Sequence, residues 1–421
     1  MTARLIQAEQ SAGEQGKIGG MSAVFNSSQE IAPRYVLSAS EKVSPRTRLA
    51  LMSSGLGRIN RGFEITTARW FEAVSASPLL ETRLYAGGDY PGALKVWNIP
   101  RDLLLNSYLK IFSHHNERAF WEFCYTIEQI SFSLCLADIL AWRPQVIWTK
   151  EIPLAHFLLV YKYMFNLPYK IIFANGGAFR PSTYKDFDYI QHLHPDSMAE
   201  AKDFGIPENK MQILPNCVFY EEPKLSREAL RTKFGYTSDD WIVISVAAWN
   251  SFQKRLDYLI DEVATIEDER VKLLLCGQPE LETDNLKARG AEKLGSRIKW
   301  LTLKPEDVHE ALAMADVFVL PSFREGLASS IIESAMAGLP IISHPHAGGK
   351  YILVDEFWLT ELKEPTALRG RLLQIRNDGV PADKLAQLKN SAGQRFSPAA
   401  LADDFVHMVL NVHDGARVRT N

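Results

Sequence analysis

The stretch ADVFVLPSFREGLASSIIESAMAGLPIISH, which runs from Ala315 to His344, determines how the second half of the chain folds. Within it, Val317–Leu320 is an uninterrupted apolar run, which predicts a strand covered on both faces. A turn with Glu325 and Gly326 follows, and then a helix from about Ala328 to Ala337. A second apolar run closes the stretch. The order strand, turn, helix, strand predicts a unit of a parallel α/β sheet.

The turn in this stretch offers groups that bind an anion and a polyol. A helix start exposes unpaired amide N–H groups and the positive end of the helix dipole. Gly326 lets a phosphate approach the backbone closely. Glu333 follows Glu325 by eight residues, about two helical turns. Two such carboxylates are common on solvated helices, but in this pattern they favour a site for a sugar-bearing diphosphate.

A second stretch, VISVAAWNSFQKRLDYLIDEV from Val243 to Val263, repeats the order. It predicts a strand, a polar loop and a helix, with Lys254 at the end of the loop. A lysine there would place a positive charge on a phosphate at the same face, and the alternative is an ordinary solvated lysine. Ligands of open α/β sheets bind at the carboxyl ends of strands. We therefore expect Lys254 and Glu325 on one rim of one sheet.

The rest of the chain alternates in the same way, so the predicted fold class is α/β with two parallel sheets. The other predicted strands are Leu49–Met52, Thr82–Tyr85, Gln145–Trp148, Lys170–Ala174, Asp188–His192, Trp241–Ala247, Val271–Cys276, Ile298–Leu301 and Pro340–Ser343. The charged segment Glu221–Asp240 is interpreted as a connection between units. The predicted division is a flexible tail at 1–47, a Rossmann-like domain at 48–220, a second at 221–396 and a final helix at 397–421.

Composition and charge exclude several classes of protein. The 421 residues are 46% hydrophobic and 23% charged, as in soluble globular proteins. Lys and Arg number 47 against 50 Asp and Glu, a net charge of −3, so no global field attracts nucleic acid. Cys124, Cys135, Cys217 and Cys276 are far apart and are interpreted as reduced thiols of a cytoplasmic protein. No signal peptide or membrane-spanning run is expected.

These motifs resemble the nucleotide-sugar half of the retaining glycosyltransferases of family four. That family has the GT-B architecture, two Rossmann-like domains whose parallel sheets face a central cleft. Its E-x7-E signature matches Glu325 and Glu333, and its strand–loop–Lys–helix element matches Lys254. The first half resembles the family more loosely, through the loop Gly55–Gly57 and the exit segment Leu214–Val218.

The resemblance implies a role for each matching residue in the transfer of a hexose from a nucleoside diphosphate sugar. Glu325 would contact the hexose near the reacting carbon, and Lys254 would neutralise the leaving diphosphate, without a metal or cofactor. The implied donor-binding residues are Glu333 for the ribose, Gly326, Leu327, Ala328 and Ser329 for the diphosphate, Trp300 and Leu301 for the base, and Gly57, Trp249 and Asn175.

The resemblance also implies the substrates and the setting. We expect a UDP-sugar with a glucose-type hexose as the donor and a sugar or lipid-linked acceptor. The acceptor would lie in the 48–220 domain, around Arg58–Arg61, Lys150–Glu151 and Asn175–Arg180. Enzymes of this kind assemble bacterial polysaccharides in the cytoplasm or at the inner face of the membrane.

Three positions depart from the family's pattern. Trp249 stands where the family often has an arginine, so Arg255 or Arg324 would have to supply the missing charge at the phosphate. Ala328 replaces a glycine, and Asn175 replaces a histidine that hydrogen-bonds to the donor sugar.

Other interpretations fit parts of the sequence. A sugar-nucleotide epimerase is the alternative enzyme, and Trp249 favours a non-catalytic nucleotide-sugar-binding protein. Asp186–Asp188 matches a manganese–diphosphate motif, and His344–His346 suggests zinc. The loop Gly55–Gly57 lacks the spacing of a dinucleotide site. The aromatic segment Arg101–Phe123 fits a buried helix pair better than a peripheral membrane contact.

Overall fold

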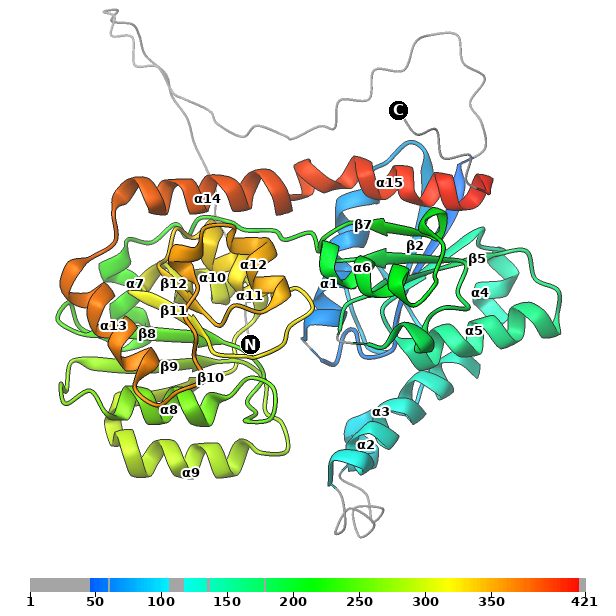
Figure 1. The fold of residues 1–421 in the computed structure, drawn as a ribbon. Coiled ribbons are helices and arrows are strands. Elements are labelled where there is room, and N and C mark those ends of the chain that lie inside the picture. The colour runs from blue at the N-terminus through cyan, green and yellow to red at the C-terminus, as the bar shows by residue number, and fades with distance from the viewer. Residues whose placement is uncertain (1–45, 60, 106–116, 135–136, 178, 416–421) are drawn as a thin grey trace, which may run out of the picture. The chain divides into compact units, whose positions relative to one another are not determined.

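The structure is a computed structural model that describes residues 46–59, 61–105, 117–134, 137–177 and 179–415 (Figure 1). The predicted tail at 1–47 lies outside these residues except for its last two positions. Cys124, Cys217 and Cys276 are buried free thiols, and Cys135 lies outside the described residues. No helix in the described ranges is long and apolar enough to cross a bilayer.

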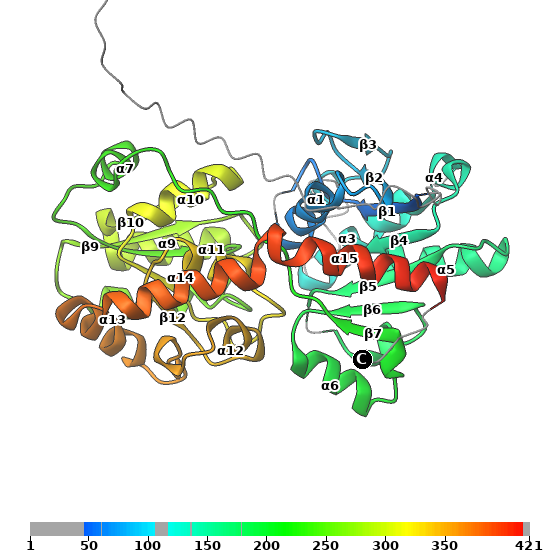
Figure 2. The ribbon, with the colours of Figure 1, turned by 90° about the horizontal axis from the view of Figure 1, so that it is seen from above.

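The first sheet has seven parallel strands in the order β3-β2-β1-β4-β5-β6-β7 (Figure 1, Figure 2). They are β1 (Thr47–Ser53), β2 (Leu80–Ala86), β3 (Ala93–Lys95), β4 (Val146–Thr149), β5 (Lys170–Asn175), β6 (Tyr189–His192) and β7 (Met211–Ile213). The five longer strands confirm the prediction. The sequence pattern missed β3 and β7 because each is short and only Met211 of their residues is buried, so neither shows a continuous apolar run.

Helices cover both faces of the first sheet. They are α1 (Gly62–Val74), α2 (Arg101–Leu105), α3 (Glu117–Leu134), α4 (Ala137–Trp142), α5 (Ile152–Met164) and α6 (Pro195–Asp203). Strand β1 is buried on both sides, since Leu49 and Leu51 belong to one core cluster and Ala50 and Met52 to another. A strand of this kind has a continuous apolar run, as β1 has from Leu49 to Met52.

The second sheet has five parallel strands in the order β10-β9-β8-β11-β12. They are β8 (Trp241–Val246), β9 (Val271–Cys276), β10 (Ile298–Leu301), β11 (Val317–Leu320) and β12 (Ile341–Ser343), and all five confirm predicted strands. Because β8 and β11 are neighbours in the sheet, the loops that follow them start from the same edge.

The helices around the second sheet include one that lies in a segment interpreted from the sequence as a connection. They are α7 (Arg227–Phe234), α8 (Leu256–Ala264), α9 (Thr283–Leu294), α10 (Pro305–Met314), α11 (Ser329–Met336), α12 (Ala347–Leu353), α13 (Ala367–Asp378) and α14 (Ala382–Phe396). The segment Glu221–Asp240 is thus not only a connection, because α7 lies in it. Leu230 anchors α7 in the core, and Arg231 donates hydrogen bonds to Asp316 and to the carbonyl of Met314.

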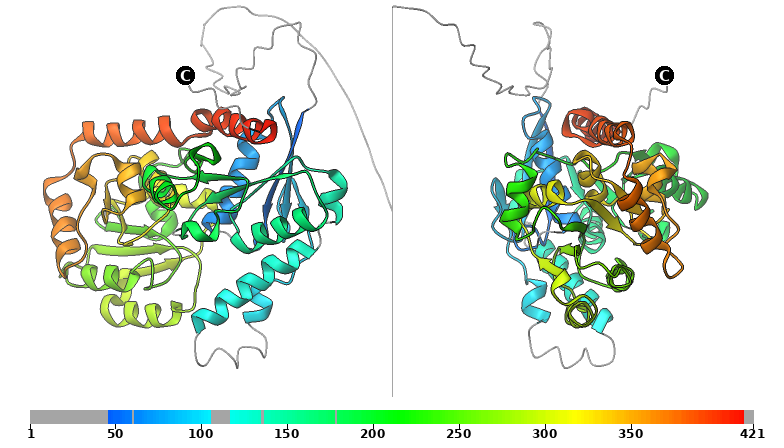
Figure 3. Two further views of the ribbon diagram at one scale, coloured as in Figure 1. Left: turned by 45° about the vertical axis from the view of Figure 1, so that its right-hand side comes forward. Right: turned by 90° about the vertical axis from the view of Figure 1, so that its left-hand side faces the viewer.

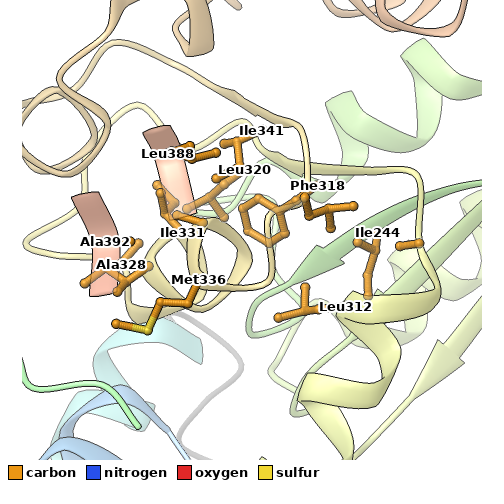
Figure 4. Packing of buried hydrophobic residues seen from close by; sticks show 14 of the residues in the cluster. Ile244, Leu312, Phe318, Leu320, Ala328, Ile331, Met336, Ile341, Leu388 and Ala392 are labelled. Carbon is orange, nitrogen blue, oxygen red and sulfur yellow. The ribbon is translucent and has the colours of Figure 1, made fainter. Parts of the chain in front are cut away.

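The core of this part surrounds α11. Phe318 and Leu320 of β11 meet Ile331 of α11, and Leu388 and Ala392 of α14 close the cluster from outside (Figure 4). This packing fixes α11, and with it the loop that precedes the helix.

The last helix, α15 (Pro398–Asp414), continues from α14 but packs on the first sheet (Figure 3). Its Phe405 ring stacks on Trp70 of α1, with 4.3 Å between the ring centroids. The chain therefore returns to its first half at the end.

Candidate functional site

The predicted pair Lys254 and Glu325 is in direct contact. Lys254 Nζ lies 2.6 Å from Glu325 Oε1, and Gln253 Nε2 donates to Glu325 Oε2 at 3.3 Å. Asn250 Oδ1 accepts the backbone N–H groups of Gln253 and Lys254, at 3.0 and 2.9 Å, and so holds the loop after β8. The two loops lie on one rim, as their positions after adjacent strands predict.

The turn at Gly326 is fixed by close backbone contacts. A Cβ atom there would lie 2.4 Å from the carbonyl oxygen of Gly176, so only glycine allows this approach. Helix α11 begins three residues later, and its N-cap residue Ala328 provides no side-chain cap to the amides. Backbone N–H groups therefore remain at the helix start for a ligand.

Glu333 has a partner that the sequence did not suggest. Its Oε1 lies 2.6 Å from Arg69 Nη2 of α1, and both side chains are largely buried. The two residues are 264 positions apart, and an arginine on a helix is ordinarily solvated. The ion pair links the first sheet's helix to α11.

A cavity of about 1270 Å³ lies in front of these loops, with walls from both halves of the chain. The predicted residues that line it are Lys254, Glu325, Gly326, Leu327, Ala328, Ser329 and Glu333. Its other charged lining residues include Arg61, Glu64, Arg69, Arg101, Lys150 and Glu280. This volume exceeds the roughly 300–1,000 Å³ of an ordinary small-molecule site, so it has room for two substrates.

Gly57 is not among the residues that line this cavity, and its approach to the donor stays a prediction. Its φ is +84°, and a Cβ atom would lie 2.6 Å from the carbonyl carbon of Gly88. The backbone conformation and the contact with the neighbouring loop explain this glycine without a ligand.

Trp249, and Trp300 and Leu301 whose backbone is predicted to meet the base, are not among the residues that line this cavity. Trp249 is only 3% exposed, belongs to a core cluster and meets Trp300 edge-on, with 5.1 Å between centroids. Leu301 packs against the core cluster on the other face of the sheet. Trp249, which was considered from the sequence as a position for a phosphate-binding cation, thus places an apolar ring in the core.

Asn175 is buried beside the cavity at the end of β5. Its side-chain oxygen accepts no hydrogen bond from the described residues, and the next residue, Gly176, lines the cavity. A role toward the donor sugar stays a prediction.

Of the two arginines considered as substitutes for the missing charge, Arg255 already has partners. Its Nη1 donates to the carbonyls of Pro321 and Leu362 at 3.0 and 2.7 Å, and its guanidinium lies over the Phe323 ring. Arg324 is exposed and lines the cavity, so it is the better placed of the two.

A network of buried charges supports the first-half wall, and its members Arg101 and Glu64 line the cavity. Arg101 Nε donates to Glu128 at 2.5 Å, and Arg101 Nη2 to Glu64 at 3.3 Å. Glu151 accepts hydrogen bonds from the Ser53 hydroxyl at 3.0 Å and the Ser54 N–H at 2.9 Å. Burial, helped by the charge of Glu64, raises the pKa of Glu151 to about 7.

The two metal motifs considered from the sequence have structural partners. Asp188 pairs with Lys162 at 2.6 Å and accepts the Ile171 N–H. His344 Nδ1 accepts from the Leu362 N–H, and His346 Nδ1 from the Gly349 N–H. Across the described part of the chain, no three His, Cys, Asp or Glu side chains group as metal ligands would.

Comparison with known proteins adds to this geometry. Residues 226–395 match the family described as Glycosyl transferases group 1. EpsD of Bacillus subtilis (strain 168), named as a glycosyltransferase, is 28% identical over 183 residues, which are 43% of this chain and 48% of that protein. UDP-Gal:alpha-D-GlcNAc-diphosphoundecaprenol alpha-1,3-galactosyltransferase of Escherichia coli is 24% identical over 223 residues, 50% of this chain and 57% of that enzyme. The chain spans about half the length of the curated relatives it matches.

Among solved structures, Anabaena Alr3699/HepE in complex with UDP and glucose is similar with a TM-score of 0.68. It is 14% identical in sequence, and the match covers 87% of this chain and 100% of that one. Similarity at this level concerns the fold, and the chain has the GT-B architecture expected from its motifs.

Proposed function

We propose that the chain is a glycosyltransferase that moves a hexose from a UDP-sugar to a glycan or lipid-linked acceptor. The reaction would retain the configuration at the anomeric carbon and need no metal. The acceptor would enter from the first-half wall, at the cytoplasmic face of a membrane where it is lipid-linked.

The observation that carries the proposal is the contact between Lys254 and Glu325 beside the uncapped start of α11. A cation and free amides at one rim suit a diphosphate. The adjacent carboxylate suits sugar hydroxyl groups. The cavity has room for an acceptor next to them.

This arrangement suits a reaction that breaks a glycosyl–phosphate bond. The bond between the anomeric carbon and the phosphate oxygen breaks, and the acceptor hydroxyl oxygen bonds to that carbon. The hydroxyl proton passes to the departing phosphate. Negative charge grows on the diphosphate in the transition state, so preorganised donors such as Lys254 Nζ and the amides of α11 would lower the barrier.

The similar proteins support the choice of substrates. The Escherichia coli relative is named for a UDP-linked donor and a diphosphoundecaprenol acceptor, and the Anabaena structure contains UDP and glucose. A lipid-linked or glycan acceptor and a uridine nucleotide are therefore the first choices.

The test is to incubate the purified protein with a panel of UDP-, GDP- and ADP-sugars, with and without a lipid-linked glycan acceptor. We expect UDP release that depends on the acceptor, a retained anomeric configuration in the product by NMR, and full activity with EDTA. Lys254→Met should abolish the reaction. Lys363→Met, whose side chain is 64% exposed, is the matched control and should not affect it.

Conversion of the donor to its epimer without an acceptor would instead make the protein an epimerase. Tight donor binding with neither hydrolysis nor transfer would make it a binding protein. Either result would overturn the proposal.

A further inference from the structure

Lys150 is a buried cation in the wall of the cavity. It follows β4, is 2% exposed and lines the cavity. A Cβ atom on Gly176 would lie 2.5 Å from Lys150 Cε and 2.9 Å from its Nζ, so the end of the lysine rests on this glycine. The carbonyl of the same Gly176 meets Gly326. The ammonium group therefore lies close to the turn that carries Glu325.

The partners of Lys150 are neutral. Its Nζ donates to Asn216 Oδ1 at 2.9 Å and lies 5.5 Å from the centroid of the Phe63 ring. Asn216 in turn donates to the carbonyl of Leu327, at 3.3 Å, in the loop before α11. No carboxylate of the described residues lies within ion-pair distance of Lys150 Nζ.

Three other cations of this cavity differ in this respect, whereas Arg255 is only half-buried and Arg324 is exposed. Arg69, Arg101 and Lys254 each contact a carboxylate. A buried charge without a counter-charge is costly, because it gives up water and gains little in return. Burial accordingly lowers the pKa of Lys150 to about 7. An ammonium group has three donors, and the amide of Asn216 uses one of them.

We propose that Lys150 binds the carboxylate of an acidic hexose, so that the preferred donor is a nucleoside diphosphate hexuronic acid rather than a neutral hexose. This inference rests on the proposed function. The diphosphate would lie at Lys254 and the start of α11, which leaves Lys150 for the sugar beyond the Glu325 turn. A carboxylate there restores the missing counter-charge, whereas a hydroxyl group of a neutral hexose does not.

The experiment measures the affinity for matched donor pairs by calorimetry. The pairs are UDP-glucose with UDP-glucuronate and UDP-galactose with UDP-galacturonate, and GDP-mannose with GDP-mannuronate covers a different base. We expect the wild-type protein to bind the acidic member at least ten times more tightly in one pair, as one well-placed ion pair allows. In Lys150→Met, which keeps the length and apolar stem, this ratio should fall to one or below.

A second variant keeps the inference testable if Lys150→Met folds poorly. Asn216→Asp is close in shape to the wild type and supplies Lys150 with an internal carboxylate, so it should abolish the preference. It also loses the hydrogen bond to the Leu327 carbonyl, and the affinity of the variant for the neutral donors measures that loss separately. Lys363→Met should leave the ratio at its wild-type value. The melting temperature without ligand reports the folding of each variant.

Equal or tighter binding of the neutral sugars by the wild type would overturn the inference and leave the proposed function standing. A preference for acidic donors that survives Lys150→Met would overturn it too. Failure of every nucleotide sugar to bind would overturn the proposed function itself.

Discussion

The two walls of the cavity are built in different ways. On the second-half wall, Lys254 and Glu325 come from loops after adjacent strands, and each faces the cavity. On the first-half wall, Arg101, Glu64 and Glu128 come from three helices and neutralise one another out of water. The first arrangement leaves charge available to a ligand, and the second uses charge to hold helices together. We therefore expect substitutions on the second-half wall to lower turnover and substitutions on the first-half wall to lower stability.

The largest effect on stability should follow Arg101→Leu. The variant leaves Glu64 and Glu128 buried without their cation, and breaking a buried pair in this way costs about 3–5 kcal/mol of the free energy of unfolding. Urea unfolding measures the loss. The control is Arg118→Leu, since Arg118 pairs with Glu122 at the surface and should cost about 0.5 kcal/mol. Equal losses of unfolding free energy in the two variants would mean that the charges around Arg101 are not shielded from water.

On the other wall, Lys254→Met should lower turnover rather than stability. Loss of one preorganised donor at a developing negative charge lowers kcat by about 10²–10³, or about 3–4 kcal/mol. Glu325 keeps its hydrogen bond from Gln253, so the melting temperature should change little. Initial rates of UDP release, with Lys363→Met as the control, measure the effect. Wild-type turnover with a normal melting temperature would remove Lys254 from the reaction.

The same contrast explains what could be predicted from the sequence. The sequence predicts a strand at Val317–Leu320 because the apolar run there is continuous. Lys254 and Glu325 each follow a predicted strand, and the two strands are neighbours in one sheet. Their contact therefore follows from local patterns. Ala93–Lys95 gave no signal because no residue in it is fully buried.

No local pattern in the sequence predicted the contacts between distant segments. Arg69 meets Glu333 only because the chain brings α1 against α11, and no motif joins them. Helix α7 is charged, and a single buried leucine, Leu230, carries most of its packing, so composition alone indicated a linker. Gly57 illustrates another limit, since its own φ of +84° requires a glycine whether or not the residue approaches a ligand.

Glu333→Gln tests whether Glu333, which pairs with Arg69 of the other half, binds the donor or only holds the two halves together. If Glu333 binds the ribose, the loss of a charged hydrogen-bond acceptor should raise KM for the donor about tenfold and leave kcat nearly unchanged. Arg69→Met is the matched variant, because it removes the same ion pair but keeps the carboxylate. It should not raise KM. An equal rise in KM in both variants would assign the pair to holding α1 and α11 together rather than to the donor.

The last prediction concerns the pH dependence of stability on the first-half wall, an effect of about 1.4 kcal/mol for each pH unit. Burial lowers the pKa of Lys150 from 10.5 to about 7, so between these values the unfolded chain holds a proton that the folded protein lacks. Unfolding then takes up a proton, and the free energy of unfolding due to Lys150 increases with pH by about 1.4 kcal/mol per unit. Urea unfolding from about pH 7 to 10 should show this slope in the wild type and a flatter one in Lys150→Met.

Glu151→Gln should change the dependence of the unfolding free energy on pH in the opposite direction, and at acid rather than alkaline pH. Burial raises the pKa of Glu151 from 4.5 to about 7, so its contribution to stability is present in acid and is lost as pH rises to about 7. Removing the carboxyl group should therefore flatten the curve below neutrality and leave the alkaline slope to Lys150. If Lys150→Met left the alkaline slope unchanged, the lysine would be charged in the folded protein without a ligand. That result would weaken the argument for an acidic sugar, because a lysine that stays charged in the free protein needs no carboxylate from a ligand to balance it.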